Sequence, residues 1–379
     1  IEGLQFLLEE DLSIDDLNDG YSLLHYAAFH NELEIVKYLV GEGLDPNYLN
    51  QDENRSVFLL STNSSVEMHE LLLSLGMTFN PEHDKAIVDE AIRYGSYELA
   101  TLYIDQGYSF DREKFFDPDF LEDEVVREQD VELLHFLIAQ GFDINTRFNK
   151  LLTYGNLLTL SMTLGADEMI EPLLKAGIDV KEYVENKSII KIAISEGRLE
   201  TVELLLKYHP DLDLNTMGGD AFDSKMNALL ESLDKKYESM VMYFLERDLD
   251  FNQAGIHDQR AIHVAAKLGA INVVQILLSK GLELDHKDSW NSTALMYAVS
   301  GQHEEVSKLI LEYKPDVNIK GKHGYTALHY AAANGMSDVV GILVNNGAQF
   351  LKNDDDKTAL DLATKGKHLE VVALLEKLK

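Results

Sequence analysis

The sequence has no cysteine, and this absence narrows the chemistry that the chain can carry out. Disulfide bridges, thiol nucleophiles and cysteine-ligated metal sites are excluded. Long apolar segments are missing as well, because no run approaches the about 20 apolar residues that a transmembrane helix needs. Neither a His-Glu-x-x-His zinc motif nor a glycine-rich phosphate loop ending in lysine occurs. We therefore expect a chain with no catalytic site, no metal, no cofactor and no membrane insertion.

The cellular compartment is open to two interpretations. Cytosolic and periplasmic proteins can both lack cysteine. The sequence begins at Ile1 instead of methionine, so a signal peptide removed before Ile1 would place the protein in the periplasm or outside the cell. Without such a peptide the cytoplasm is expected, and we favour it.

Positive charge is scarce, and it is unevenly distributed. The chain has 33 Lys and Arg against 66 Asp and Glu, a formal net charge of −33. Residues 253–379 hold 14 basic and 15 acidic residues, so residues 1–252 hold 19 basic and 51 acidic ones, a net charge of −32. Such a field repels nucleic acid and anionic lipid and attracts basic proteins. It also promotes solubility, and both interpretations stay open.

A short repeat is what the sequence does contain. Thr-Ala-Leu-Met-Tyr-Ala at 293–298 returns as Thr-Ala-Leu-His-Tyr-Ala at 326–331 and as Thr-Ala-Leu-Asp-Leu-Ala at 358–363. Each run predicts a first helix with small residues, and a second, more apolar helix follows. Asn334-Gly335 is the break between the two helices in the best-formed unit. A period of about 33 residues indicates stacked units that bury their apolar faces against their neighbours.

These units resemble ankyrin repeats, whose usual Thr-Pro-Leu-His stands here as Thr-Ala-Leu-His. The resemblance is strongest over 257–379 and 20–47, and regularly spaced turn residues connect the two. It implies an all-α ankyrin-repeat solenoid, a curved stack of helix-turn-helix-loop units. We count about eleven repeats plus a partial N-terminal one, which together cover the whole chain. The expected parts are a partial capping repeat at 1–19, divergent acidic repeats at 20–252, and regular repeats with a C-terminal cap at 253–379.

Some positions depart from the family pattern. Pro172 falls within a predicted second helix and should kink it. His209-Pro210 and Lys314-Pro315 replace the glycine that usually follows the second helix, so we expect those turns to avoid glycine geometry. Longer spacings predict insertions near 145–158 and 214–228.

The resemblance also assigns a structural role to one column of histidines. His25, His263 and His329 occupy the Thr-x-x-His position, whose ring bonds the backbone of a neighbouring loop in ankyrin repeats. They are therefore not expected to bind a ligand.

A second column falls at predicted loop tips. His257, Trp290 and His323 are spaced by 33 residues, and Lys322 lies beside the last of them. Ankyrin proteins commonly bind partners with these tips and the adjoining first helices, so all four are candidate partner-binding residues. Alternatively, Trp290, the only tryptophan, packs on the next loop and stiffens the stack.

An acidic and aromatic segment at 110–130 is the other candidate surface. Its phenylalanines are either apolar anchors for a basic protein or part of the repeat core, with the acids as a solvated face. The acidic candidates for partner binding are Asp111, Asp117, Asp119, Glu122, Asp123 and Glu124.

The function that these features predict is protein binding without catalysis. In its most concrete form, the protein is an inhibitor or immunity protein, monomeric on its own, that wraps and occludes a basic toxin or enzyme. One alternative is an adaptor or secreted effector that bridges host proteins through the regular C-terminal repeats. Another is an enzyme whose site lies in a divergent central repeat.

Overall fold

The structure is a computed structural model that describes most of the chain. The described residues are 21–49, 57, 65–78, 86–150, 153–181, 183–184, 187–214, 227–247 and 249–378. The partial repeat predicted at 1–19 therefore lies outside the described residues. The chain divides into two compact units, residues 1–146 and residues 147–379.

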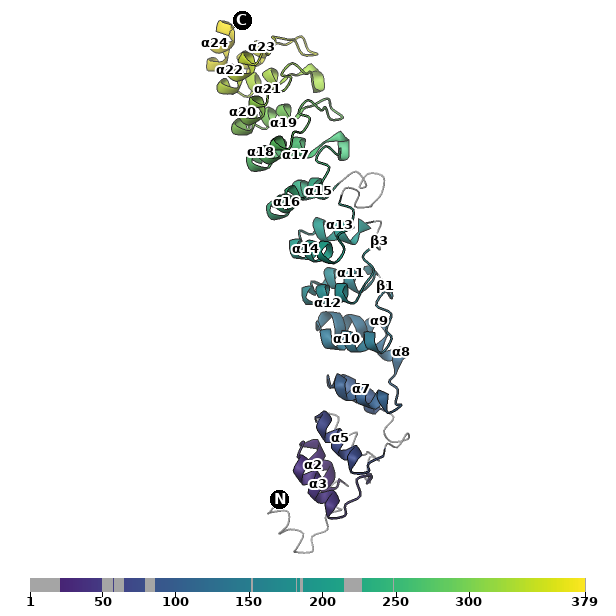
Figure 1. The fold of residues 1–379 in the computed structure, drawn as a ribbon. Coiled ribbons are helices and arrows are strands. Elements are labelled where there is room, and N and C mark those ends of the chain that lie inside the picture. The colour runs from purple at the N-terminus through teal and green to yellow at the C-terminus, as the bar shows by residue number, and fades with distance from the viewer. Residues whose placement is uncertain are drawn as a thin grey trace. The chain divides into compact units, whose positions relative to one another are not determined.

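In the first unit, short helices follow one another in pairs (Figure 1). A first helix is followed after a tight turn by an antiparallel second helix, and a loop leads to the next pair. The elements are α2 (Leu23–Phe29), α3 (Leu33–Gly41), α5 (Val66–Ser74), α6 (Ile87–Arg93), α7 (Tyr97–Asp105), α8 (Arg112–Phe115), α9 (Pro118–Phe120), the π-helical η1 (Leu121–Arg127) and α10 (Val131–Ala139).

The second unit continues the same pattern and adds two small antiparallel hairpins, β1–β2 and β3–β4. Its elements are β1 (Phe148–Lys150), β2 (Thr153–Gly155), α11 (Leu157–Leu164), η2 (Asp167–Met169), α12 (Ile170–Lys175), β3 (Tyr183–Val184), β4 (Lys187–Ser188), α13 (Ile189–Ser195), α14 (Leu199–Tyr208), α15 (Ala228–Lys235), α16 (Glu238–Leu245), η4 (Ile256–Asp258), α17 (Ala261–Leu268), α18 (Ile271–Ser279), α19 (Ala294–Ser300), α20 (Glu304–Glu312), η5 (Lys322–Gly324), α21 (Ala327–Ala333), α22 (Ser337–Asn345), α23 (Ala359–Gly366) and α24 (Leu369–Leu378).

The described residues contain ten helix pairs, and α5 is the second helix of a further repeat. This agrees with the eleven repeats counted from the sequence, and the all-α ankyrin solenoid is confirmed. Within the described ranges, the two hairpins are the β-structure added to this helical pattern.

The small residues of the first helices let neighbouring pairs approach closely. In α21 the side chains of Ala327, Ala331 and Ala332 are buried, and α22 buries Val339 and Leu343 on its inner side. A fully buried aliphatic side chain contributes about 1.5–3 kcal/mol relative to an exposed one. Much of the apolar stripe of each pair faces the next pair, so stability depends on stacking.

The turn between the two helices of a pair needs a left-handed residue. The ten pairs all have a residue with φ between 55° and 75° there, and half of these residues are not glycine: Asn31, Gly95, Gln129, Gly165, Gly197, Lys236, Gly269, Gln302, Gly335 and Lys367.

Two departures from the family pattern can be compared with the structure. Pro172 is the third residue of α12, which directly follows the 3-10 turn η2. The kink expected at Pro172 stays a prediction. Lys314 has φ of 55° and takes the conformation usual for glycine, which corrects the expectation for that turn. His209, with φ of −133°, avoids it as expected.

The predicted insertion near 145–158 is the hairpin β1–β2, in which Asn149 pairs with Tyr154. The hairpin β3–β4 was not predicted. Most of the insertion predicted at 214–228 lies outside the described residues.

Candidate functional site

The histidine column has the structural role that the family resemblance implies. His329 is 1% exposed, and its Nδ1 accepts a hydrogen bond from the backbone N–H of Thr326 at 3.1 Å. The same ring meets the carbonyl oxygen of Lys357 in the next loop with Nε2 at 3.1 Å. Burial lowers the pKa of His329, because a charged imidazolium loses its hydration there. His263 repeats this geometry with the backbone of Arg260 and His286, and burial lowers its pKa too.

Four loop tips in the second unit share one backbone geometry. In each tip the first residue donates its N–H to the carbonyl of the fifth, and the fourth donates to the first. The five-residue tips are 255–259, 288–292, 321–325 and 353–357, with N···O distances of 2.7–3.2 Å. We call them the first to fourth loop tips.

The loop tips are bonded to one another in pairs. The backbone N–H of Ser289 in the second tip donates to the carbonyl of His257 in the first, at 2.9 Å. The backbone N–H of Asp354 in the fourth tip donates to the carbonyl of His323 in the third, at 3.1 Å. No described hydrogen bond joins the second tip to the third.

Asp288 organises the second loop tip from inside. Its side chain is 3% exposed, and its Oδ1 accepts the backbone N–H groups of Trp290 and Ser292, both at 2.9 Å. Its Oδ2 accepts the Tyr297 hydroxyl at 2.6 Å and Nε2 of Gln259 at 3.2 Å. Burial, and then Asp288, raise the pKa of Tyr297, so the tyrosine stays a donor. A buried carboxylate with four donors is held in one geometry, and it fixes the backbone that carries Trp290.

The structure brings several predicted loop-tip residues together. The rings of His257 and Trp290 lie 4.6 Å apart between centroids, and Trp290 remains 37% exposed. Trp290 and Lys322 both line a groove of about 290 Å³ between the second and third tips. His323 is exposed at the third tip and has φ of 57°. Trp290 thus packs on its neighbour and still presents a surface, and its role in partner binding stays a prediction.

The acidic segment 110–130 is largely helical and contains α8, α9 and η1. Its phenylalanines join the core: Phe115 is fully buried, Phe110 is 8% exposed, and the Phe115 and Phe120 rings meet edge to face at 4.9 Å. This supports the interpretation of these rings as repeat core.

Several acids of that segment have local structural partners. Asp111 accepts the backbone N–H of Lys114 at the start of α8, and Asp117 caps α9 in the same way. Glu122 and Asp123 form ion pairs with Arg127 at 2.6 Å and 3.1 Å. Asp119 and Glu124 are also exposed. Partner binding by these six carboxylates stays a prediction.

A column of glutamates in the first unit was not predicted from the sequence. Glu34, Glu67, Glu98 and Glu132 are each the second residue of a second helix, in α3, α5, α7 and α10. Carboxylates are favoured there because the helix N-terminus carries partial positive charge. The last three line one groove of about 450 Å³ together with Tyr97. Their spacing of 31 to 34 residues was the available signal.

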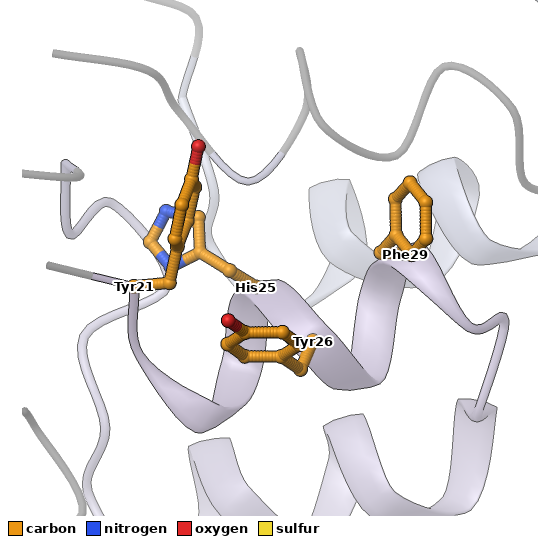
Figure 2. Close-up of a pocket in the computed structure, with 4 residues that line it drawn as sticks. All are labelled: Tyr21, His25, Tyr26 and Phe29. Atoms are coloured by element: carbon orange, nitrogen blue, oxygen red, sulfur yellow. The ribbon is translucent and has the colours of Figure 1, made fainter. Parts of the chain in front are cut away.

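An aromatic pocket at the start of the described chain was also missed (Figure 2). The pocket has a volume of about 210 Å³ and is lined by three residues of α2 and by Tyr21, which precedes the helix: the lining residues are Tyr21, His25, Tyr26 and Phe29. Tyr21 and Tyr26 meet edge to face at 5.9 Å, and Tyr26 and Phe29 are 41% and 51% exposed. The i, i+3 spacing of Tyr26 and Phe29 places both on one side of α2, but no sequence pattern shows that these two side chains are exposed.

The described residues show neither a metal-binding cluster nor a membrane-spanning helix. The part of the chain that the structure describes contains no group of three or more His, Asp or Glu placed to hold a metal ion. None of its helices has the length and apolar character that crossing a bilayer requires.

Relatives of known annotation resemble the chain over part of their own length. An ankyrin repeat protein of Fowlpox virus is 24% identical over 364 residues, which is 93% of this chain and 61% of the relative. Alpha-latrocrustotoxin-Lt1a of Latrodectus tredecimguttatus is 24% identical over 93% of this chain and 23% of its own length. Palmitoyltransferase AKR1 of Lachancea kluyveri is 24% identical over 51% of this chain and 31% of its own length. The chain thus spans less than two thirds of each.

Family models account for most of the sequence. A model of ankyrin repeats in three copies matches residues 24–114, 226–321, 262–354 and 315–378. A model of ankyrin repeats in many copies matches residues 1–40. These matches cover well over half of the chain, in agreement with the stacked helix pairs, and the chain belongs to the ankyrin repeat family.

Proposed function

We propose that this protein captures a basic protein with its first unit and blocks that partner's working surface without catalysing a reaction. Ankyrin repeats are scaffolds for protein–protein interaction, which provides the general part of this function. The identity of the partner as a basic toxin or enzyme, and the role of inhibitor or immunity protein, are the specific part.

The observation that carries the proposal is the charge of the first unit. Residues 1–146 contain 32 Asp and Glu and 7 Lys and Arg, a net charge of −25. The glutamate column adds an ordered element, because Glu67, Glu98 and Glu132 face one groove instead of being scattered. A dense field of one sign raises the rate of encounter with a partner of the other sign.

The aromatic pocket suits the same class of partner. Lysine and arginine side chains bind over the faces of tyrosine and phenylalanine rings, and such contacts contribute about 0.5–2 kcal/mol. Tyr21, Tyr26 and Phe29 offer such rings within the acidic unit (Figure 2). The acids would attract a basic surface, and the rings would then give it a fixed position.

Occlusion follows from the size of the scaffold. A standard interface covers about 800 Å² on each partner. Stacked repeats offer a longer surface than this, so a bound partner can lose access to its own substrate without any chemical step.

A neutralised triple variant, Glu67→Gln with Glu98→Gln and Glu132→Gln, tests the proposal. The probe is an arginine-rich decapeptide, titrated at several salt concentrations. We expect the triple variant to bind at least about threefold more weakly at low salt, because exposed ion pairs contribute about 0.2–1 kcal/mol each and three of them are removed. We also expect salt to weaken wild-type binding, because ions screen exposed charges.

The second unit offers a matched control at the same helix position. Glu305, Asp338 and Glu370 are the second residues of α20, α22 and α24, so neutralising them removes the same number of charges from helix N-termini. The control triple should bind the decapeptide like the wild type. Equal loss in the two triples, or binding indifferent to salt, would contradict capture by the first unit.

The adaptor is the second candidate function, and the exposed Trp290 beside Lys322 favours it. In that case the regular repeats hold the partner. When a partner protein has been identified, the adaptor function predicts that Trp290→Ala abolishes binding of that partner and that the glutamate triple variant does not. The inhibitor proposal predicts the reverse.

A further inference from the structure

The groove between the second and third loop tips has a composition unlike the rest of the chain. Its walls include the exposed face of Trp290, the rings of Tyr297 and Tyr330, and the side chains of Lys267 and Lys322. No carboxylate of the described residues lines it, although the chain has twice as many acidic as basic residues. The groove is therefore a local basic and aromatic site on an acidic protein.

Its polar groups are available to a ligand. Lys267 and Lys322 are exposed, and neither ammonium group is paired with another residue in the described part of the chain. The Tyr330 hydroxyl likewise has no hydrogen-bond partner among the described residues, while burial raises its pKa and keeps it a donor. Two other basic side chains near the loop tips are engaged instead: Arg260 pairs with Glu283 at 2.8 Å, and Lys320 donates to the carbonyl of Lys352 at 2.9 Å.

Each wall of the groove is held in place by its own hydrogen bonds. The Asp288 network fixes the second tip beneath Trp290, and the third tip is bonded to the fourth through His323 and Asp354. Gly321 packs closely against α19 and the second tip, since an added Cβ would lie 2.7 Å from Sδ of Met296 in α19 and 3.3 Å from the carbonyl oxygen of Asn291. A ligand would therefore meet a preformed site, which reduces the entropy cost of binding.

We propose that this groove binds an acidic segment of a partner protein, with carboxylates of that segment on Lys267 and Lys322 and an adjoining side chain against Trp290. Charge complementarity selects this occupant, because two unpaired ammonium groups and a free hydroxyl donor recognise carboxylates. This site is separate from the capture of a basic partner proposed above, since it lies in the other unit and takes the opposite charge. The protein would then hold two partners of opposite charge.

The only tryptophan of the chain lies in the groove, so its fluorescence reports binding. The probe is a blocked octapeptide of alternating glutamate and alanine, and its counterpart has glutamine in place of glutamate. We expect a saturable change in Trp290 emission with the glutamate peptide at low salt, and at least about fivefold weaker binding of the glutamine peptide.

Two variants locate the site. Lys322→Glu and Lys267→Glu should each weaken the glutamate peptide about fivefold or more, as measured by calorimetry as well as fluorescence. Lys377→Glu on α24 makes the same change in net charge outside the groove and should leave the affinity unchanged. The glutamate triple of the first unit should also bind this peptide normally, which separates the inference from the proposed function.

Three results would overturn the inference. They are equal binding of the two peptides, no saturable binding at millimolar peptide, and full affinity in the Lys322→Glu variant. Stronger binding of a lysine-alanine peptide at Trp290 would also overturn it, because the groove would then select the opposite charge.

Discussion

Two glycines of the last repeats allow a direct test of how closely the units pack. Gly335 and Gly347 flank α22, and both have positive φ, 74° and 87°. A Cβ added at Gly335 would lie 2.5 Å from Nδ1 of His368 in the next repeat, whereas one added at Gly347 meets nothing within 4 Å. Alanine at either position has the same backbone cost of about 1–2 kcal/mol.

Only Gly335→Ala must also displace a neighbour. The His368 ring is held by its Nε2, which lies 2.8 Å from the carbonyl oxygen of Ala333. Moving it costs about 1–3 kcal/mol for overpacking and about 1 kcal/mol for the lost hydrogen bond. Gly335→Ala should therefore lower the free energy of unfolding by about 2–4 kcal/mol more than Gly347→Ala.

Urea unfolding followed by circular dichroism and by Trp290 fluorescence measures the difference. Repeat arrays can unfold in parts, so both signals are needed to compare the variants. Equal losses in the two variants would refute the reasoning, because they would mean that His368 moves aside at no cost.

Three further changes give separate tests. Asp288→Asn keeps an acceptor for the backbone of the second tip, but its amide group faces two donors, the Tyr297 hydroxyl and Nε2 of Gln259. It should therefore destabilise the protein by about 1–3 kcal/mol and speed hydrogen exchange at the Ser292 amide, and unchanged exchange would contradict this expectation. Burial lowers the pKa of His329 below its ordinary 6.5, so the stabilising contribution of this histidine is present above pH 6.5 and is lost as the pH falls through the folded-state pKa. His329→Gln should therefore make the urea midpoint less dependent on pH between 5 and 7.5. An unchanged pH dependence would count against this role of His329. Lys367→Gly should raise the thermal midpoint, because φ of 58° costs lysine about 1–2 kcal/mol and glycine avoids this cost. The larger conformational entropy that glycine has in the unfolded chain offsets only part of the gain, so a lower midpoint would contradict the argument.

The repeat architecture could be predicted from the sequence because its signals are local. Turn glycines such as Gly335 and the Thr-x-x-His run at 326–329 each specify the conformation of their own segment. The role of His329 in bonding the next loop followed from the family resemblance, and the structure confirms it. The separate column of His257, Trp290 and His323 predicted the positions of the loop tips.

Features that depend on how a turn closes, or on contacts between repeats, could not be predicted from the sequence. Lys314 adopts a left-handed conformation because the turn must close, with its N–H on the carbonyl of Leu311, and this outweighs its own preference. The aromatic pocket around Tyr26 depends on which side chains of α2 stay exposed once the repeats stack, and nothing in the residues of α2 decides that. The unpaired state of Lys267 and Lys322 depends on where the carboxylates of other repeats point.

The pairing of the loop tips defines a larger building block than the single repeat. Tips that begin with Gly255 and Gly321 alternate with tips that begin with Asp288 and Asn353, and each bonded couple contains one of either kind. Deleting one repeat from this region would leave a tip without its bonded neighbour. Deleting two consecutive repeats would keep the alternation of tips that begin with glycine and tips that begin with Asp or Asn. Arrays cut or extended from this region should therefore keep their loop geometry only when the number of repeats changes in even steps.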